Sequence, residues 1–148
     1  TVLGVIDRPG IAVSLFEPLA EADISVDVIV QNASVDGATD LTFTVERTDL
    51  SRTMEVISPV AEGLGSRGVV SADNLAKVSV VGTGMQDAPG YAARMFRALA
   101  DHGINIEMIT TSEIRITCLI DESLVPEAAR ALHAAFELEE EDGPAAQR

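Results

Sequence analysis

The sequence contains two copies of one motif, placed 80 positions apart. Residues 7–12 read Asp-Arg-Pro-Gly-Ile-Ala, and residues 87–92 read Asp-Ala-Pro-Gly-Tyr-Ala. The alignment has no gap, and the matched pairs include Phe16/Phe96, Leu19/Leu99 and Ile24/Ile104. A repeat of this length indicates two copies of one small domain. Domains of this size suggest ligand binding and pairing rather than catalysis.

The composition limits both the core and the partners. The chain has 148 residues, of which 47% are hydrophobic but only 3% aromatic, so the core must be aliphatic. A net charge of −14 leaves no basic stripe for a phosphate backbone or an anionic membrane surface. No apolar run approaches the roughly 18 residues of a membrane-spanning helix. We therefore expect no nucleic-acid partner and no membrane partner.

Residues that could carry out chemistry are few. The single cysteine, Cys118, lies in an apolar run and is expected to be a buried small hydrophobe, as in a reducing cytoplasm. The histidines His102 and His133 stand alone, so no metal site is expected. The sequence has no nucleophile elbow, and Gly-Thr-Gly-Met at residues 82–85 lacks the ending of a phosphate-binding loop. We expect a cytoplasmic protein that is not an enzyme by itself.

Hydrophobic periodicity predicts six elements in the first copy. The expected strands are 2–6, 24–30, 41–45 and 69–70, and the expected helices lie at 12–22 and around 54–60. Pro18 is expected to kink or loosen the first helix, because proline lacks the backbone N–H. Asp49 or Ser51 is expected to cap the second helix, with Pro59 near its end.

The second copy repeats this order. The expected strands are 78–81, 104–111 and 114–120, and the expected helices are 91–102 and 126–136. The second of these helices is expected to bury Ala129, Leu132, Ala135 and Phe136. Gly103 is expected to end the first helix. Residues 82–87 are expected to form a loop and residues 139–148 an acidic, disordered tail, and no fourth strand is evident.

The element order predicts an α+β fold made of two ferredoxin-like domains. A β-α-β-β-α-β order gives a four-stranded antiparallel sheet with both helices on one face. The expected boundaries are 1–74 for the first domain and 75–138 for the second. Such sheets leave open edges, which are either blunted or used for pairing. We expect the sheets to pair side by side in a dimer.

The repeated Asp-x-Pro-Gly motif lies where a loop enters a helix. Glycine allows close approach of the backbone, and the N-terminus of a helix offers free N–H groups that bind a carboxylate. Asp7 or Asp87 can accept hydrogen bonds from an ammonium group, and residues 25–27 and 105–107 add polar groups. These features fit an α-amino acid as ligand. The alternative is that the motif is only a turn and a helix cap.

Longer stretches resemble the tandem ACT domains of aspartate kinases. Residues 1–10 (Thr-Val-Leu-Gly-Val-Ile-Asp-Arg-Pro-Gly) and 28–32 (Val-Ile-Val-Gln-Asn) resemble the first ACT domain. Residues 77–85 (Lys-Val-Ser-Val-Val-Gly-Thr-Gly-Met), 105–116 (Asn-Ile-Glu-Met-Ile-Thr-Thr-Ser-Glu-Ile-Arg-Ile) and 131–136 (Ala-Leu-His-Ala-Ala-Phe) resemble the second. The run Thr-Thr-Ser-Glu-Ile-Arg at 110–115 is especially specific.

The resemblance implies an allosteric regulatory part of aspartate kinase, either a separate β subunit or a fragment. That enzyme uses ATP to convert L-aspartate to 4-phospho-L-aspartate, the first step toward lysine, threonine and methionine. The kinase domain, with its ATP and Mg²⁺, would lie outside this chain, so no cofactor is expected here. The implied partners are a catalytic α subunit and a second copy of this chain. The resemblance also implies that a strand preceding Thr1 completes the second domain.

In this family, end-product amino acids such as L-threonine and L-lysine bind between paired ACT domains and cause feedback inhibition. The resemblance assigns effector contacts in the first domain to Asp7, Arg8, Pro9, Gly10, Ile11, Ala12, Ser25, Val26, Asp27 and Gln31. In the second domain it assigns them to Tyr91, Ala92, Asn105, Ile106, Ser112 and Glu113.

The implied roles follow the chemistry of an amino acid. Asp7 would accept the ammonium group, the amides of residues 10–12 would bind the carboxylate, and Gln31 would contact a hydroxyl or carbonyl. Asn105 and Ile106 would close the pocket from the paired domain. Threonine is favoured for the first-domain site, with lysine at the interface, where a carboxylate of Asp27, Glu107 or Glu113 could hold its side chain.

Departures from the family pattern support a rival interpretation. Ser25 stands where asparagine is usual, and Asp87-Ala88 replaces Ser-His before the second Pro-Gly. Under the rival interpretation, the ACT pair is a dimerisation scaffold that binds no effector.

Overall fold

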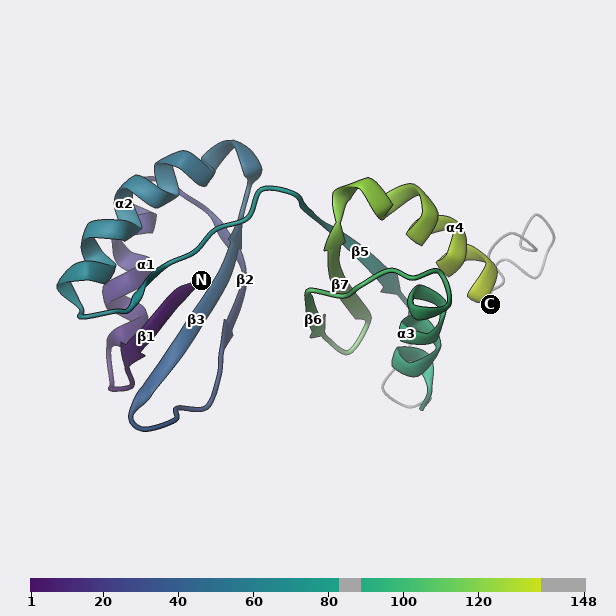
Figure 1. The fold of residues 1–148 in the computed structure, drawn as a ribbon, viewed down its shortest axis with the longest axis horizontal. Coiled ribbons are helices and arrows are strands. Elements are labelled where there is room, and N and C mark those ends of the chain that lie inside the picture. Colours follow the sequence, from purple (N-terminus) through teal and green to yellow (C-terminus); the bar gives the residue numbers. More distant parts are fainter. Residues whose placement is uncertain (83–88, 137–148) are drawn as a thin grey trace. The chain divides into compact units, whose positions relative to one another are not determined.

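The computed structural model describes residues 1–82 and 89–136. The chain divides into two compact units, Thr1–Asp73 and Asn74–Arg148, each with its own hydrophobic core (Figure 1). The expected loop at 82–87, apart from Gly82, and the expected tail at 139–148 lie outside the described residues.

The first unit has the predicted β-α-β-β-α-β order. Its elements are β1 (Val2–Ile6), α1 (Ile11–Glu21), β2 (Val26–Gln31), β3 (Ala38–Val45), a 3₁₀ turn (Arg47–Asp49), α2 (Leu50–Gly63) and β4 (Gly68–Val69). The strands form one antiparallel sheet in the order β2-β3-β1-β4. This arrangement confirms the predicted ferredoxin-like fold.

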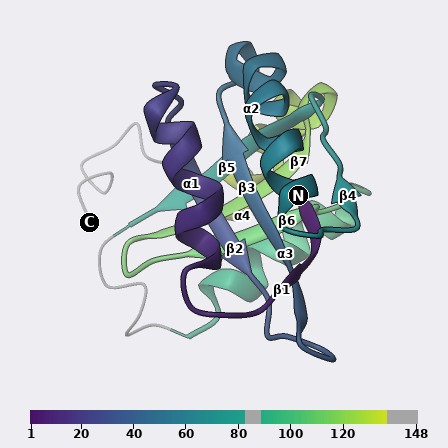
Figure 2. The ribbon, with the colours of Figure 1, turned by 90° about the vertical axis from the view of Figure 1, so that its left-hand side faces the viewer.

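Helices α1 and α2 cover one face of this sheet (Figure 2). The fully buried side chains between them and the sheet are Val2, Val5, Leu15, Leu19, Leu41 and Ile57. Along β2, half-buried Val26, Val28 and Val30 alternate with exposed Asp27, Ile29 and Gln31. The alternation confirms that one face of this strand is apolar and places Gln31 on the other face.

The second unit repeats the arrangement with one strand fewer among the described residues. Its elements are β5 (Leu75–Val81), α3 (Tyr91–Asp101), β6 (Met108–Thr111), β7 (Arg115–Asp121), a 3₁₀ turn (Glu122–Leu124) and α4 (Val125–Ala135). The described strands form an antiparallel sheet in the order β5-β7-β6. Strand β7 is therefore central, as β3 is in the first unit.

The core of the second unit is aliphatic, as the composition predicts. Its fully buried side chains include Met95, Leu99, Cys118 and Ile120. The expectation that α4 buries Ala129 is wrong, because Ala128 is buried and Ala129 is exposed. The true stripe is Ala128, Ala131, Leu132 and Ala135, which keeps the spacing of three and four residues that places side chains on one helix face.

The first helix of each unit ends in the same hydrogen-bond pattern. Asp23 (φ 59°) and Gly103 (φ 67°) adopt the left-handed conformation, and the next amide returns to the helix. The returning bonds are Ile24 N to Leu19 O and Ile104 N to Leu99 O, both 2.9 Å. This confirms Gly103 as a helix end.

The same turns delay the following strands. The expected starts at Ile24 and Ile104 are wrong, since β2 begins at Val26 and β6 at Met108. The isoleucines are buried and tied to the preceding helix. Apolar periodicity alone does not distinguish such an anchored turn residue from the first residue of a strand.

Two expectations about the helices of the first unit concern Pro18 and the start of α2. Helix α1 continues through Pro18 to Glu21, with buried Leu15 and Leu19 on either side of it, so the proline does not end the helix. Asp49 is the N-cap residue of α2, as expected, but its side chain makes no capping hydrogen bond. The Asp49 carboxylate instead pairs with Arg52 at 3.0 Å.

Gly4 marks a bulge in β1 and generates a test of the fold. Its φ is +61°, the β1–β3 register shifts around it, and its N–H donates to Asp40 Oδ1 at 2.8 Å. A Cβ at this position would overlap the Arg67 side chain, whereas a Cβ on Gly37 (φ +76°) would meet open space.

We expect Gly4→Ala to lower the free energy of unfolding by about 2–3 kcal/mol, from left-handed strain plus the displaced arginine. Gly37→Ala is the matched control and should cost only about 1 kcal/mol. Urea unfolding of both variants measures the difference. Equal losses would show that the contact with Arg67 adds no cost.

Candidate functional site

The first helix of each unit begins in the same way. Gly10 (φ +88°) and Gly90 (φ +102°) are the N-caps of α1 and α3, and neither helix has a side-chain cap. Because the first amides of a helix have no intrahelical acceptor, they are left to bind solvent or a ligand. Both junctions therefore offer N–H donors and the positive end of a helix dipole.

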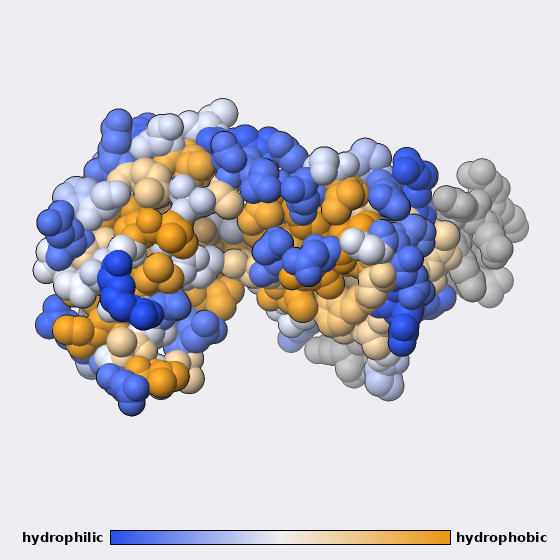
Figure 3. All heavy atoms as spheres, in the orientation of Figure 1, coloured by the Kyte–Doolittle hydropathy of each residue, from blue (hydrophilic) through white to orange (hydrophobic). Residues whose placement is uncertain are grey.

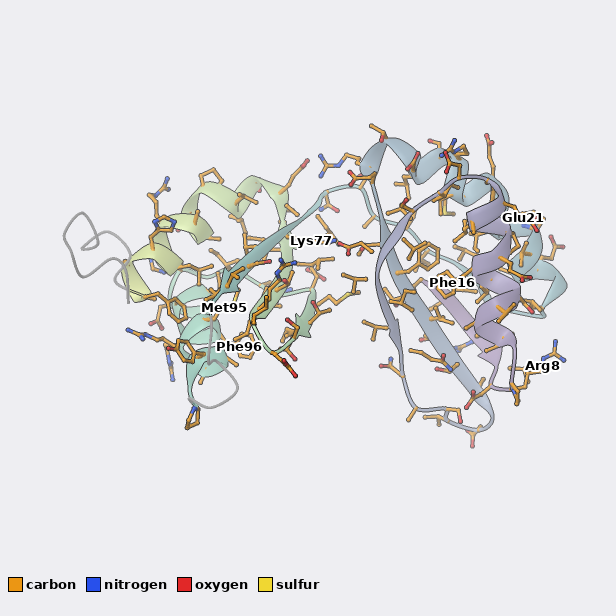
Figure 4. All side chains as sticks on the ribbon, turned by 180° about the vertical axis from the view of Figure 1, so that it is seen from behind. Arg8, Phe16, Glu21, Lys77, Met95 and Phe96 are labelled. Atoms are coloured by element: carbon orange, nitrogen blue, oxygen red, sulfur yellow. The ribbon has the colours of Figure 1, made fainter. Side chains whose placement is uncertain are left out.

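The segment before α1 is exposed but anchored at both ends. The Asp7 amide donates to Gly37 O at 2.9 Å, and Ile11 is buried in the core. The Arg8 side chain points away from the body of the unit (Figure 4). This segment holds a carboxylate, a guanidinium and the first amides of α1 within six residues, and among these the Ile11 amide donates to Arg8 O at 3.2 Å.

The sheet topology decides which predicted residues of the first unit share an end. Strands β1 and β2 both run antiparallel to β3, so their C-terminal ends point the same way. Gln31, the last residue of β2, therefore lies toward the end of the sheet that holds residues 7–12. The residues Ser25, Val26 and Asp27 lie at the opposite end, near the C-terminus of α1, where Figure 4 labels Glu21.

The second unit separates its predicted residues in the same way. Tyr91 and Ala92 open α3, and Ser112 and Glu113 form the β6–β7 turn, which bonds to the end of β5 through Gly82 N to Ile114 O at 2.9 Å. Asn105 and Ile106 precede β6 at the other end. The Asn105 amide donates to Glu107 Oε1 at 3.0 Å.

In each unit, two groups of predicted residues therefore lie at one end of the sheet, and a third group lies at the other end. The helix start and the end of the neighbouring edge strand lie at one end of the unit. The start of that edge strand is remote within the same unit. A pocket that uses both ends therefore needs a second domain.

Sequence reasoning missed two side chains beside Tyr91. The Tyr91 and Phe136 rings stack with centroids 6.1 Å apart and planes 4° apart, and Arg94 Cζ lies 5.0 Å from the Phe136 centroid. For Arg94 the sequence contained a signal, because Tyr91 and Arg94 are three residues apart on one helix and share a face.

The open edges of both sheets carry an exposed isoleucine at the same position of the repeat. Ile29 on β2 is 53% exposed, and Ile109 on β6 is 45% exposed. Among the described strands, both lie at the edge of their sheet, and apolar residues are visible on the surface of both units (Figure 3). Apolar side chains on an open edge are typical of strands that pair.

Other kinds of site are not found in the described part of the chain. Over residues 1–82 and 89–136, no group of three His, Cys, Asp or Glu side chains could hold a metal ion. Among the same residues, no helix is long and apolar enough to cross a membrane. Cys118 is completely buried, as predicted, and burial raises the pKa of its thiol to about 11.

Comparison with known proteins identifies the family. An ACT domain model matches residues 1–59 and 78–136, which is most of the chain. The regulatory subunit of aspartate kinase from Thermus thermophilus, in its ligand-free form, is 39% identical with a TM-score of 0.83, covering 91% of this chain and 89% of that one. The chain belongs to the ACT-domain family of aspartokinase regulatory subunits.

Further relatives agree with this ACT-family assignment. A crystal structure of aspartokinase α and β subunits matches with 46% identity and a TM-score of 0.84, over 92% of this chain and 89% of that chain. The aspartokinase of Pseudomonas aeruginosa is 47% identical over 147 residues, and that of Corynebacterium glutamicum is 46% identical over 144. These matches cover 99% and 96% of this chain but only 35% and 34% of the relatives. The ACT pair thus spans about a third of these curated relatives.

The buried thiol gives a test of the second core. At pH 8 a pKa of about 11 leaves about one thiolate in a thousand, against about one in ten for an unfolded cysteine with a pKa of 9.0. We expect Cys118 to react with a thiol reagent at least about 100-fold more slowly in the native protein than in urea.

The same thiol predicts a pH dependence with a definite sign. Between about pH 9 and pH 11 the unfolded chain has lost this proton while the folded chain retains it. The free energy of unfolding should therefore fall as the pH rises through this window. A Cys118→Ala variant, compared by urea unfolding at several pH values, should lack that component. In the reactivity experiment, a Cys118 thiol that reacts as fast in the native protein as in urea would contradict its burial.

Proposed function

We propose that this chain is the amino-acid-sensing part of an aspartate kinase. The observation that carries the proposal is the uncapped, glycine-started helix found at the same place in two units of an aspartokinase regulatory family. The activity to be regulated would be the phosphorylation of L-aspartate by ATP on a catalytic subunit or domain outside this chain. End-product amino acids would inhibit that activity.

The chemistry of the junction supports a free amino acid as effector. The Gly10 and Ala12 amides and the helix dipole suit the α-carboxylate, and Asp7 suits the α-ammonium. The Ile11 amide already donates to Arg8 O at 3.2 Å. Gln31 lies toward the same end of the unit and offers both a donor and an acceptor. L-threonine is the proposed ligand of this site, and L-lysine is proposed for the interface.

The separation of Ser25–Asp27 from the helix start supports a pocket shared between domains. The corresponding Asn105 and Ile106 of the second unit would close a pocket from a paired domain. Pairing through the β2 and β6 edges would bury Ile29 and Ile109 and consume open strand edges. A homodimer is therefore part of the proposal.

Inhibition would then be a population shift. An effector that binds one arrangement of the paired domains more tightly makes that arrangement accumulate, and the linkage is reciprocal. The catalytic α subunit would respond to that arrangement rather than to the ligand itself.

Thermal unfolding with candidate effectors tests the proposal. At 100 times its dissociation constant, a ligand adds about 2.7 kcal/mol of stability, which is about 5–10 °C for a chain of this size. We expect a shift with L-threonine or L-lysine, a larger one with both, and none with L-leucine or L-methionine. No shift with any amino acid would favour the scaffold alternative.

Thermal unfolding of an Asp7 variant tests whether the ligand binds at the start of α1. Asp7→Asn removes the charge that the ammonium group needs, so we expect the threonine shift to fall by at least about half. Asp73→Asn removes one exposed carboxylate elsewhere and is the matched control. Equal shifts in both variants would mean that Asp7 takes no part in binding.

Pairing can be tested by placing a charge on the open edge. We expect Ile29→Glu to weaken the dimer about tenfold, or about 1.4 kcal/mol, because the apolar contact of Ile29 with a neighbouring side chain across the paired edge would be lost. Val70→Glu is the matched control, since Val70 is 52% exposed and follows β4 at the other edge of the sheet. Sedimentation velocity measures both. A monomeric wild-type chain would contradict the dimer.

A further inference from the structure

The start of α3 lies against a ring at the end of α4. Tyr91 is the first residue of α3, and Phe136 immediately follows α4, where its N–H donates to Leu132 O at 3.0 Å. The two rings stack with planes 4° apart, and the Arg94 guanidinium lies over the Phe136 ring. A single aromatic side chain therefore contacts two residues in the first turn of α3.

The first unit holds its helix start differently. The equivalent of Tyr91 is Ile11, which is buried in the core, and the equivalent of Arg94 is Ser14, whose hydroxyl donates to Gly10 O at 3.1 Å. In the second unit Tyr91 is only half-buried, and its packing includes the stack on Phe136. The two copies thus share a backbone geometry but not the contacts that fix it.

We infer that Phe136 is a positioning residue for the effector site of the second unit. By holding Tyr91 and Arg94, it fixes the first turn of α3, which carries both the first amides of the helix and a guanidinium group, and these groups suit the carboxylate of an amino acid. This inference rests on the proposed effector function. It adds that the second site depends on a residue from another helix, which the first site does not.

The composition supplies a direct probe of this site. The chain has one tyrosine, Tyr91, and no tryptophan. Tyrosine fluorescence of the full chain therefore reports on the start of α3 alone. Titration with L-threonine and, separately, with L-lysine would follow ligand at the second site, while calorimetry would follow total binding.

The test variant is Phe136→Leu, which keeps an apolar side chain but removes the ring. Phe96→Leu is the matched control, because Phe96 also packs against the core of the second unit (Figure 4). We expect Phe136→Leu to lower the fluorescence anisotropy of Tyr91 and to weaken the fluorescence-detected binding about tenfold, or about 1.4 kcal/mol. Phe96→Leu should leave both quantities close to the wild type.

A second variant tests the inference even if Phe136→Leu does not fold correctly. Arg94→Gln changes an exposed side chain and creates no cavity. It should weaken the fluorescence-detected binding about threefold, without lowering the melting temperature of the free protein by more than about 2 °C.

Several results would overturn the inference. These are unchanged binding in both Phe136→Leu and Arg94→Gln, equal weakening by Phe136→Leu and Phe96→Leu, or calorimetric binding to the wild type that leaves the Tyr91 signal unchanged. In each case the proposed effector function would survive. No calorimetric binding of either amino acid would instead remove the proposed function, and the inference with it.

Discussion

In each unit, two strands hydrogen-bond to opposite edges of a central strand. This pairing determines which residues lie at the same end of the sheet. In the first unit β3 separates β1 from β2 and forces them to run in the same direction. The end of β1 can then lead directly into α1, which begins at the same end of the sheet as the end of β2. The start of β2 is held at the far end by the same constraint. Under the proposed function, a ligand site that uses both ends would recruit a second domain, and topology would then link pairing to sensing.

The second unit reuses this plan with different side chains. Its central strand is β7, and its helix start has the same left-handed glycine. A buried isoleucine anchors the first helix, whereas stacked rings and a guanidinium hold the other. The two copies therefore share a backbone conformation but differ in the side chains that hold it. Under the proposed function, this difference would let two sites bind one class of ligand, an amino acid, with different selectivity.

The repeat and the periodic apolar residues were enough to predict the element order and one ferredoxin-like sheet. Local sequence failed where tertiary contacts decide the outcome. Helix α1 tolerates Pro18 because its leucines are buried, and Ile24 belongs to a helix end rather than to a strand. On α4 the prediction that Ala129 is buried was wrong, because its neighbour Ala128 is the buried residue. The Tyr91–Phe136 stack joins residues 45 positions apart, so no local pattern contains it.

The two hydrophobic cores have no residue in common, since each cluster lies within one unit. Each core can therefore open and close as a cooperative entity of its own, with its own set of slowly exchanging amide hydrogens. A small molecule that stabilises one unit would retard exchange throughout that core and leave the other at its own rate, unless the units are energetically coupled. The extent to which protection spreads from one core to the other would thus measure their communication directly, in the unmutated chain.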